Sequence, residues 1–88
     1  MKWDIQYSRD ADVFIGKQNV RAQVREGLEL FLRKIKGERA NVDVKKLKGD
    51  WKGYLRIRKG KLRVIFLVDF SERVIYVERV DFRGKAYK

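Results

Sequence analysis

The strongest structural signal in the chain is YLRIRKGKLRVIFLV, residues 54–68. Leu55 and Ile57 alternate there with polar and aromatic side chains, which is the period of two of a strand with one buried face. Lys59-Gly60 then predicts a tight turn, because glycine adopts a positive φ without strain. Residues 62–68 are almost continuously apolar, as in a central strand covered on much of both faces. The stretch therefore predicts a β-hairpin whose second strand is central.

The flanking segments predict two more strands. Residues 69–72 are polar and indicate a turn, so residues 73–80 are expected to form the last strand of a three-stranded meander, followed by a polar tail over residues 81–88. Near the other end, apolar and polar side chains alternate from Trp3 to Tyr7, which predicts a further half-buried strand.

Two helices are expected between the first strand and the hairpin. Ser8 is placed to cap a short helix, which Gly16 is expected to end. Asn19 is expected to cap a second helix, and Lys36-Gly37 to close it. The short link between them predicts an antiparallel helical hairpin. Apolar residues at spacings of three and four form a stripe along the second helix: Val20, Val24, Leu28, Phe31 and Ile35.

Residues 38–53 are polar and contain glycines, so they are expected to form a connecting loop with Val44, Leu47 and Trp51 held against the core. The element order is then strand, helix, helix and meander. This order predicts an α+β fold in which the helices pack on one face of a four-stranded, mostly antiparallel sheet. The 88 residues contain no repeat or linker, so one domain over residues 1–88 is expected.

Composition excludes several classes of chemistry. The chain has no cysteine and no histidine, which removes thiolate nucleophiles, Ser-His-Asp triads and zinc sites of the usual kind. Its carboxylates are scattered and no phosphate-binding glycine motif is present, so no metal and no cofactor are expected. Neither a signal peptide nor a membrane span is apparent, and a soluble cytoplasmic protein is the expectation.

Positive charge is concentrated around this stretch, residues 54–68. The net charge is +11, and residues 45–63 carry nine basic side chains against one acidic one. In the predicted strands the cations fall on the face opposite Leu55 and Ile57, with Trp51 and Tyr54 among them. Cations that neutralise phosphates and rings that stack on bases are what single-stranded nucleic acid requires. The alternative is the ordinary solvated face of a highly charged protein.

Leu47-Lys48-Gly49, followed by residues 53–66, resembles the RelE/ParE superfamily of toxin–antitoxin toxins. Members typically carry Leu-x-Gly and then two arginine-bearing strands around a glycine turn. The closing VDFRGKAYK, residues 80–88, resembles their C-terminal ending with an arginine and a tyrosine. The opening strand and the helical hairpin also suit the family, so the resemblance covers nearly the whole chain.

The resemblance implies a helical hairpin against a curved sheet whose concave basic face is the working surface. It also implies an antitoxin that wraps and neutralises the toxin. In the RelE branch the implied activity is ribosome-dependent mRNA cleavage, in which a 2′-hydroxyl attacks the adjacent phosphate without a metal. The implied partners are therefore an antitoxin, the ribosome and mRNA. The alternatives are a ParE-like toxin that poisons DNA gyrase without cleaving RNA, and a catalytically weak binding module.

Matched to the family pattern, the catalytic residues are Arg56, Arg63, Arg83 and Tyr87. The resemblance implies that Arg63 forks onto two phosphate oxygens and stabilises their charge in the transition state. It implies that Arg83 holds the phosphate or assists the leaving 5′-oxygen, and that Tyr87 stacks on a base or accepts a proton. The expected RNA-binding residues are Lys45, Lys46, Lys48, Lys52, Tyr54, Arg58, Lys61 and Lys85.

Each of these roles has a structural alternative. Arg63 is alternatively a salt-bridging residue of the sheet, Arg83 a solvated tail charge, and Tyr87 a ring that closes the edge of the core. The chain also departs from the RelE pattern, because arginines stand where RelE proteins carry lysines on the first meander strand, and arginine cannot act as a base. The candidates for the proton acceptor are Tyr87, Lys61, Lys85 and, less suitably, Glu78.

Overall fold

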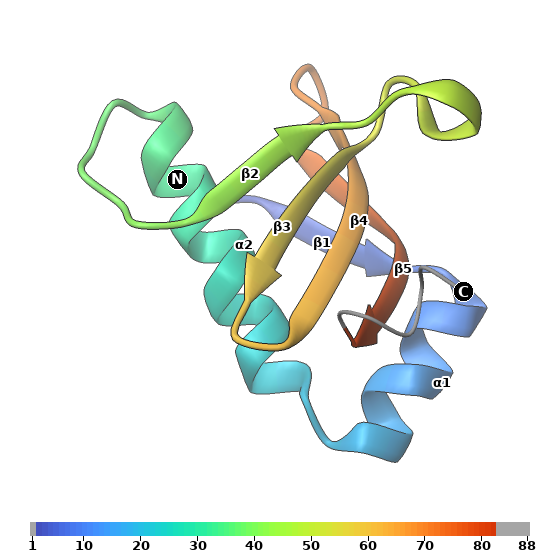
Figure 1. The fold of residues 1–88 in the computed structure, drawn as a ribbon. Coiled ribbons are helices and arrows are strands. Elements are labelled where there is room, and N and C mark those ends of the chain that lie inside the picture. The colour runs from blue at the N-terminus through green and yellow to red at the C-terminus, as the bar shows by residue number, and fades with distance from the viewer. Residues whose placement is uncertain (1, 83–88) are drawn as a thin grey trace.

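The computed structural model describes residues 2–82, in which two helices pack against a five-stranded sheet (Figure 1). The elements are β1 (Asp4–Tyr7), α1 (Arg9–Gln18), α2 (Arg21–Ile35), β2 (Asp43–Lys46), the 3₁₀ helix η1 (Gly49–Trp51), β3 (Leu55–Lys59), β4 (Leu62–Asp69) and β5 (Val74–Phe82). This is the expected α+β fold with one strand more than predicted. None of the helices in the described part is long and apolar enough to cross a bilayer.

The strands lie in the order β1-β5-β4-β3-β2. Strand β1 runs parallel to β5, and the other neighbours are antiparallel, so the sheet is mixed. The additional strand is β2, which lies in the segment 38–53 that was expected to be a loop. It pairs with β3, with Val44 opposite Ile57 and Lys45 opposite Arg56. Four residues with one apolar side chain carry too little periodicity to indicate a strand. Segment 43–46 becomes a strand because it pairs with β3.

Both helices contribute to one core beneath the sheet. Helix α1 lies against β5 and β1, whereas α2 lies against β3. Leu28 and Phe31 of α2 and Phe66 of β4 are buried together with the apolar face of the meander. The predicted stripe of α2 is buried except for Ile35, which is 42% exposed in the last turn of the helix.

The boundary between the helices differs from the prediction. Gly16 lies inside α1, and Asn19 ends this helix instead of starting the next one. Its backbone is left-handed, with φ at 55°, and its N–H donates to the carbonyl of Ile15. Asparagine tolerates this conformation at a helix C-terminus, so the same residue type serves either end of a helix. Gly37, at φ 88°, follows α2 as expected.

The two faces of the sheet have opposite character, as the alternation in residues 54–68 predicts. Ile57, Val64 and Phe66 point into the core, whereas Arg56 and Arg63 lie on the face without helices, which we call the open face. At the end of β4, the Asp69 carboxylate accepts hydrogen bonds from the Glu72 backbone N–H and the Ser71 hydroxyl. These bonds form the turn and lower the pKa of Asp69.

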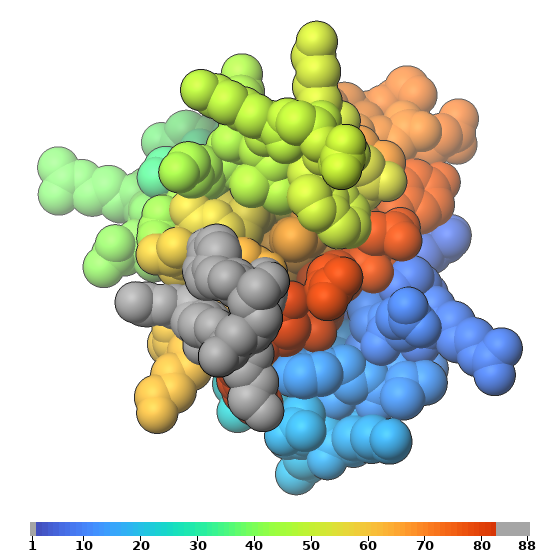
Figure 2. Space-filling model, turned by 45° about the vertical axis from the view of Figure 1, so that its right-hand side comes forward, coloured from blue at the N-terminus to red at the C-terminus, as the bar shows by residue number. Residues whose placement is uncertain are grey.

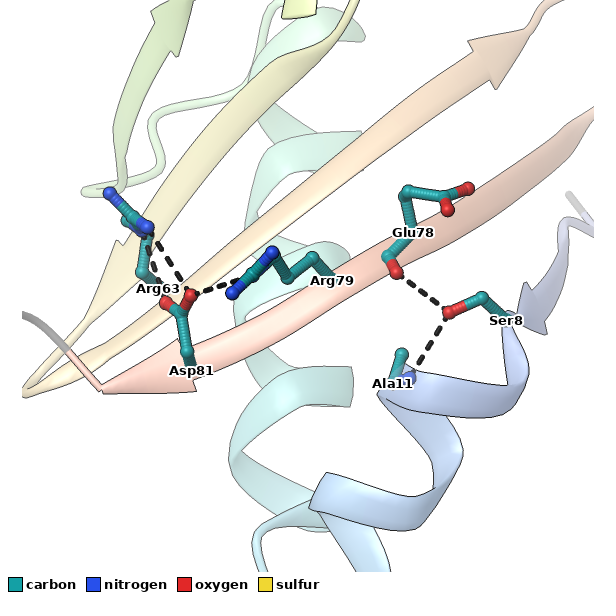
Figure 3. Close-up of polar contacts among 6 residues, drawn as sticks. All are labelled: Ser8, Ala11, Arg63, Glu78, Arg79 and Asp81. Carbon is teal, nitrogen blue, oxygen red and sulfur yellow. Dashed lines mark hydrogen bonds and ion pairs between the residues drawn. The ribbon is translucent and has the colours of Figure 1, made fainter. Parts of the chain in front are cut away.

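A β-bulge in β5 connects the sheet to α1. Ile65 pairs with Arg79 and Phe66 with Val77, which leaves Glu78 as the extra residue. Ser8 serves both structures: its hydroxyl donates to the Glu78 carbonyl at 2.6 Å and accepts the Ala11 N–H at 3.1 Å (Figure 3). The expected N-cap at Ser8 is confirmed, and it also satisfies the carbonyl that the bulge removes from the ladder.

Replacing Ser8 by alanine should therefore lower the free energy of unfolding by about 1–2 kcal/mol, because a helix cap and a hydrogen bond at the bulge are lost together. Chemical denaturation of the wild-type and variant proteins measures the change. Ser71→Ala is the matched control, since the Ser71 hydroxyl bonds only an exposed carboxylate in the turn. Equal effects of the two substitutions would show that Ser8 does not join the bulge to the helix.

Candidate functional site

Two arginines are buried on the open face. Among the described residues, the buried charged side chains are Arg56 of β3 and Arg63 of β4, which are 5% and 9% exposed. Arg58 lies directly opposite Arg63 in the pairing of these strands. Three guanidinium groups are thereby placed on adjacent positions of two neighbouring strands. Water is largely excluded from two of them, so their charges are screened less than those of surface arginines.

These arginines line a groove of about 360 Å³, which we call the Trp51 groove. Its lining residues are Lys45, Leu47, Trp51, Arg56, Arg58, Arg63 and Ile65. Helix η1 brings Trp51 to this side of the sheet, where the indole contacts the Tyr54 ring edge-to-face with 5.1 Å between centroids. In Figure 2 the yellow-green segment that carries η1 stands above the yellow, orange and red strands of the sheet.

The groove corrects one expectation about the core. Val44 packs against the core as predicted, whereas Leu47 and Trp51 line the groove on the opposite side of the sheet. A single aromatic residue in a glycine-bearing segment carries no period, so its side could not be read from the sequence. An aromatic wall beside buried cations can contact a base and its phosphate at once.

Arg56 lacks a complete set of partners in the part of the chain that the structure describes. Its Nη1 lies 3.5 Å from the Asp43 carboxylate, but this carboxylate is 56% exposed and also lies 3.9 Å from Arg58. The contact is an ion pair without hydrogen-bond geometry, and buried Nη1 makes no hydrogen bond to any described residue. Buried donors in native proteins are almost always bonded, so this one calls for an acceptor outside residues 2–82. An anion in the groove would supply it.

Arg63 is held by a carboxylate that the sequence analysis missed. Its Nε and Nη2 donate to the two oxygens of Asp81 at 3.1 and 3.2 Å, and Arg79 Nε donates to the same carboxylate at 3.1 Å (Figure 3). Residue 81 was expected in the polar tail, but β5 continues to Phe82 and pairs Asp81 with Arg63. The alternation of Val80 and Phe82 with polar residues was the available signal. Arg63 thus makes a salt bridge and also lines the groove.

Several predicted RNA-binding residues lie elsewhere. Tyr54 and three lysines line a second hollow, of about 620 Å³, which we call the apolar hollow. Its lining residues are Lys46, Lys48, Lys52, Gly49, Gly53, Leu47, Tyr54, Leu55, Val68 and Phe70. Lys46 lines the apolar hollow whereas Lys45 lines the Trp51 groove, because neighbouring residues of a strand point to opposite faces. Lys61 is exposed in the β3–β4 turn.

The remaining predicted site residues, Arg83, Lys85 and Tyr87, lie outside the described residues. The groove therefore unites Lys45, Arg56, Arg58 and Arg63 from the predicted set and adds Trp51. Within residues 2–82 no group of three or more acidic side chains is placed to hold a metal ion.

Solved structures of toxin–antitoxin proteins resemble this fold over nearly the whole chain. A chain of the RelBE2 toxin–antitoxin complex of Mycobacterium tuberculosis has a TM-score of 0.70 at 20% identity, and the match covers 94% of this chain and 100% of that one. The archaeal RelE–RelB complex of Pyrococcus horikoshii matches at 28% identity and a TM-score of 0.62, covering 97% and 99%. The YoeB/ParE toxin of Agrobacterium tumefaciens matches at 21% and 0.62, covering 91% and 98%. No protein-family model matches the sequence, and no curated protein matches it in a sequence comparison.

Proposed function

Because the chain has the fold of the RelE/ParE superfamily of toxins, we propose that it is the toxin of a toxin–antitoxin pair and that it cleaves mRNA on the ribosome. The observation that carries the proposed activity is the buried Nη1 of Arg56, which has no hydrogen-bond acceptor among residues 2–82 and lies in a groove lined by two further arginines and a tryptophan. A phosphodiester supplies the acceptor oxygens, and its base supplies a face for the indole.

The proposed reaction is an internal transfer within the RNA. The 2′-oxygen forms a bond to the adjacent phosphorus while the bond to the 5′-oxygen breaks, which gives a 2′,3′-cyclic phosphate and a 5′-hydroxyl. Negative charge grows on the non-bridging oxygens, and Arg56 and Arg63 are placed to stabilise it. The 2′-hydroxyl proton goes to a base and the leaving oxygen takes a proton. Arginine cannot be that base, so the acceptor belongs to the candidates Lys61, Glu78, Lys85 and Tyr87.

The proposed antitoxin contacts the apolar hollow. The floor of this hollow includes Leu55, Val68 and Phe70, and the Phe70 side chain is 63% exposed. Lys46, Lys48 and Lys52 surround it. An amphipathic segment with acidic residues beside its apolar ones would complement both features, because it covers the exposed apolar surface and neutralises the lysines. We propose that the antitoxin supplies such a segment.

The activity is tested by mapping mRNA 5′ ends. Primer extension on a reporter mRNA in a translating cell-free extract should detect cuts inside codons that disappear when ribosomes are omitted. Arg56→Gln should reduce cleavage about 10²–10³-fold, the effect of removing one preorganised donor from an oxyanion site. Arg33→Gln removes the same charge from the exposed surface of α2 and should leave cleavage unchanged.

Intact mRNA together with arrested growth would contradict RNA cleavage and favour the second candidate function, a ParE-like toxin that acts on DNA gyrase. The similarity to a protein described as a YoeB/ParE toxin supports keeping this candidate. A supercoiling assay with purified gyrase then distinguishes the two. Cleavage of equal efficiency by the Arg56→Gln variant would contradict the assignment of the Trp51 groove.

A further inference from the structure

We propose that Asp81 is a positioning residue: its carboxylate holds one edge of the Arg63 guanidinium and thereby presents the other edge to a phosphate in the Trp51 groove. This inference rests on the proposed function and extends it to a residue that the family pattern does not assign. Its basis is the side-on pairing of Arg63 with Asp81, in which Nε and Nη2 each bond one carboxylate oxygen.

The location of Asp81 favours positioning over blocking. Asp81 does not line the Trp51 groove, which Arg63 does. It lines an adjoining hollow together with Asp10, Phe14, Glu78, Arg79 and Val80, and Trp51 is the residue that this hollow shares with the groove. In Figure 3 one side of the Arg63 guanidinium faces Asp81, and the other end is turned away from it. A guanidinium has two edges that can each bond an anion with two N–H groups, so Asp81 and a phosphate can bind Arg63 together.

The pairing across the sheet explains why Arg63 needs such support. Asp43, Arg58, Arg63 and Asp81 occupy one continuous row over β2, β3, β4 and β5. Two cations therefore lie side by side in the centre, with a carboxylate at each end. Repulsion between Arg58 and Arg63 favours separation of the two guanidinium groups, and the two hydrogen bonds to Asp81 oppose a displacement of Arg63. The Asp81 side chain is only 14% exposed, so its hold on Arg63 is weakly screened by water.

A second contact fixes the carboxylate itself. Arg79 Nε donates to Asp81 Oδ2 at 3.1 Å, the oxygen that also accepts from Arg63 Nη2. Arg79 lies on the open face because the bulge at Glu78 shifts the register of β5. The bulge, and therefore the Ser8 contact that satisfies it, sets the side of the sheet to which Asp81 points.

The test observes the Arg63 Nε–H by ¹⁵N NMR in the full chain while a fully 2′-O-methylated single-stranded RNA is added. This RNA binds but cannot be cleaved by a 2′-hydroxyl. The expected result is that the Nε–H signal keeps its chemical shift and its protection from exchange when RNA is bound. Loss of that protection would show that phosphate displaces Asp81, and it would overturn the proposal. Absence of any RNA binding would show that the Trp51 groove does not take a phosphodiester, and it would overturn the inference, whereas the proposed function is tested separately by the reporter-mRNA cleavage assay with ribosomes.

Cleavage measurements provide the second readout. Asp81→Asn should lower the cleavage rate at saturating RNA at least tenfold, while the affinity for the methylated RNA stays equal or rises, because a negative charge has left the basic face. Asp81→Glu retains the charge but moves the carboxylate by one methylene, and should lower the rate with affinity unchanged. The control is Asp12→Asn, which removes a carboxylate of α1 from an exposed salt bridge with Arg21 of α2 and should change neither quantity. Full activity of both Asp81 variants would overturn the proposal.

Discussion

Replacing Phe66 by alanine lowers the free energy of unfolding by about 3–5 kcal/mol, the range for removing a buried aromatic ring from a core. Phe66 lies in the central strand β4 and is fully buried. Its ring contacts Phe31 of α2 edge-to-face, with 5.0 Å between centroids and 72° between planes. The side chain therefore joins the sheet to the longer helix, and the cavity left by alanine cannot close without moving α2. Urea denaturation followed by circular dichroism measures the change.

Phe70→Ala is the matched control for this prediction. Phe70 follows the same strand, but its side chain is 63% exposed and touches Trp3 with 6.0 Å between ring centroids. The same atoms are deleted at both positions, so a difference in stability reports burial and not chemistry. We expect a loss below about 1 kcal/mol at Phe70, as for other exposed positions. A similar loss at both positions would mean that the core does not extend through Phe66.

Replacing Arg56 by methionine should raise the free energy of unfolding by about 1–3 kcal/mol while it abolishes RNA cleavage. Arg56 is nearly buried, its Nη1 lacks a hydrogen bond among the described residues, and its ionic partner Asp43 remains solvated without it. Replacing buried ions by apolar side chains of similar length is often stabilising by about 1–4 kcal/mol. Methionine also removes the repulsion between Arg56 and the neighbouring arginines of the groove.

Thermal and urea denaturation of the Arg56→Met variant test this expectation, with Arg33→Met on the exposed surface of α2 as the control. The control should change stability by less than about 0.5 kcal/mol. A stable but inactive variant at position 56 would show that the groove arginine is retained for binding at the expense of folding, as is common in functional sites. A marked loss of stability would instead show that Asp43 and the sheet fully compensate the buried charge.

The open face and the core face of the meander were predictable because they depend on neighbouring residues. Leu55 and Ile57 must point away from Arg56 once residues 55–59 form a strand, whatever the strand pairs with. The Ser8 cap and the Gly60 turn are equally local, since each requires a residue type at one position. The prediction that Asn19 starts the second helix was wrong because the local sequence does not decide this boundary. Asparagine suits both ends of a helix, and packing chooses between them.

The local pattern of residues is enough to predict which side chains share a face of each strand, and hence that arginines gather opposite the core. The contacts that these arginines make depend on the tertiary structure. Asp81 reaches Arg63 across 18 residues of chain, and Ser8 reaches the bulge at Glu78 across 70. Strand β2 exists because β3 supplies its hydrogen bonds, and Trp51 lines the groove on the open face because η1 carries it there. The period of a strand is a property of its own backbone, whereas register and contact depend on distant partners whose pairing no local pattern encodes.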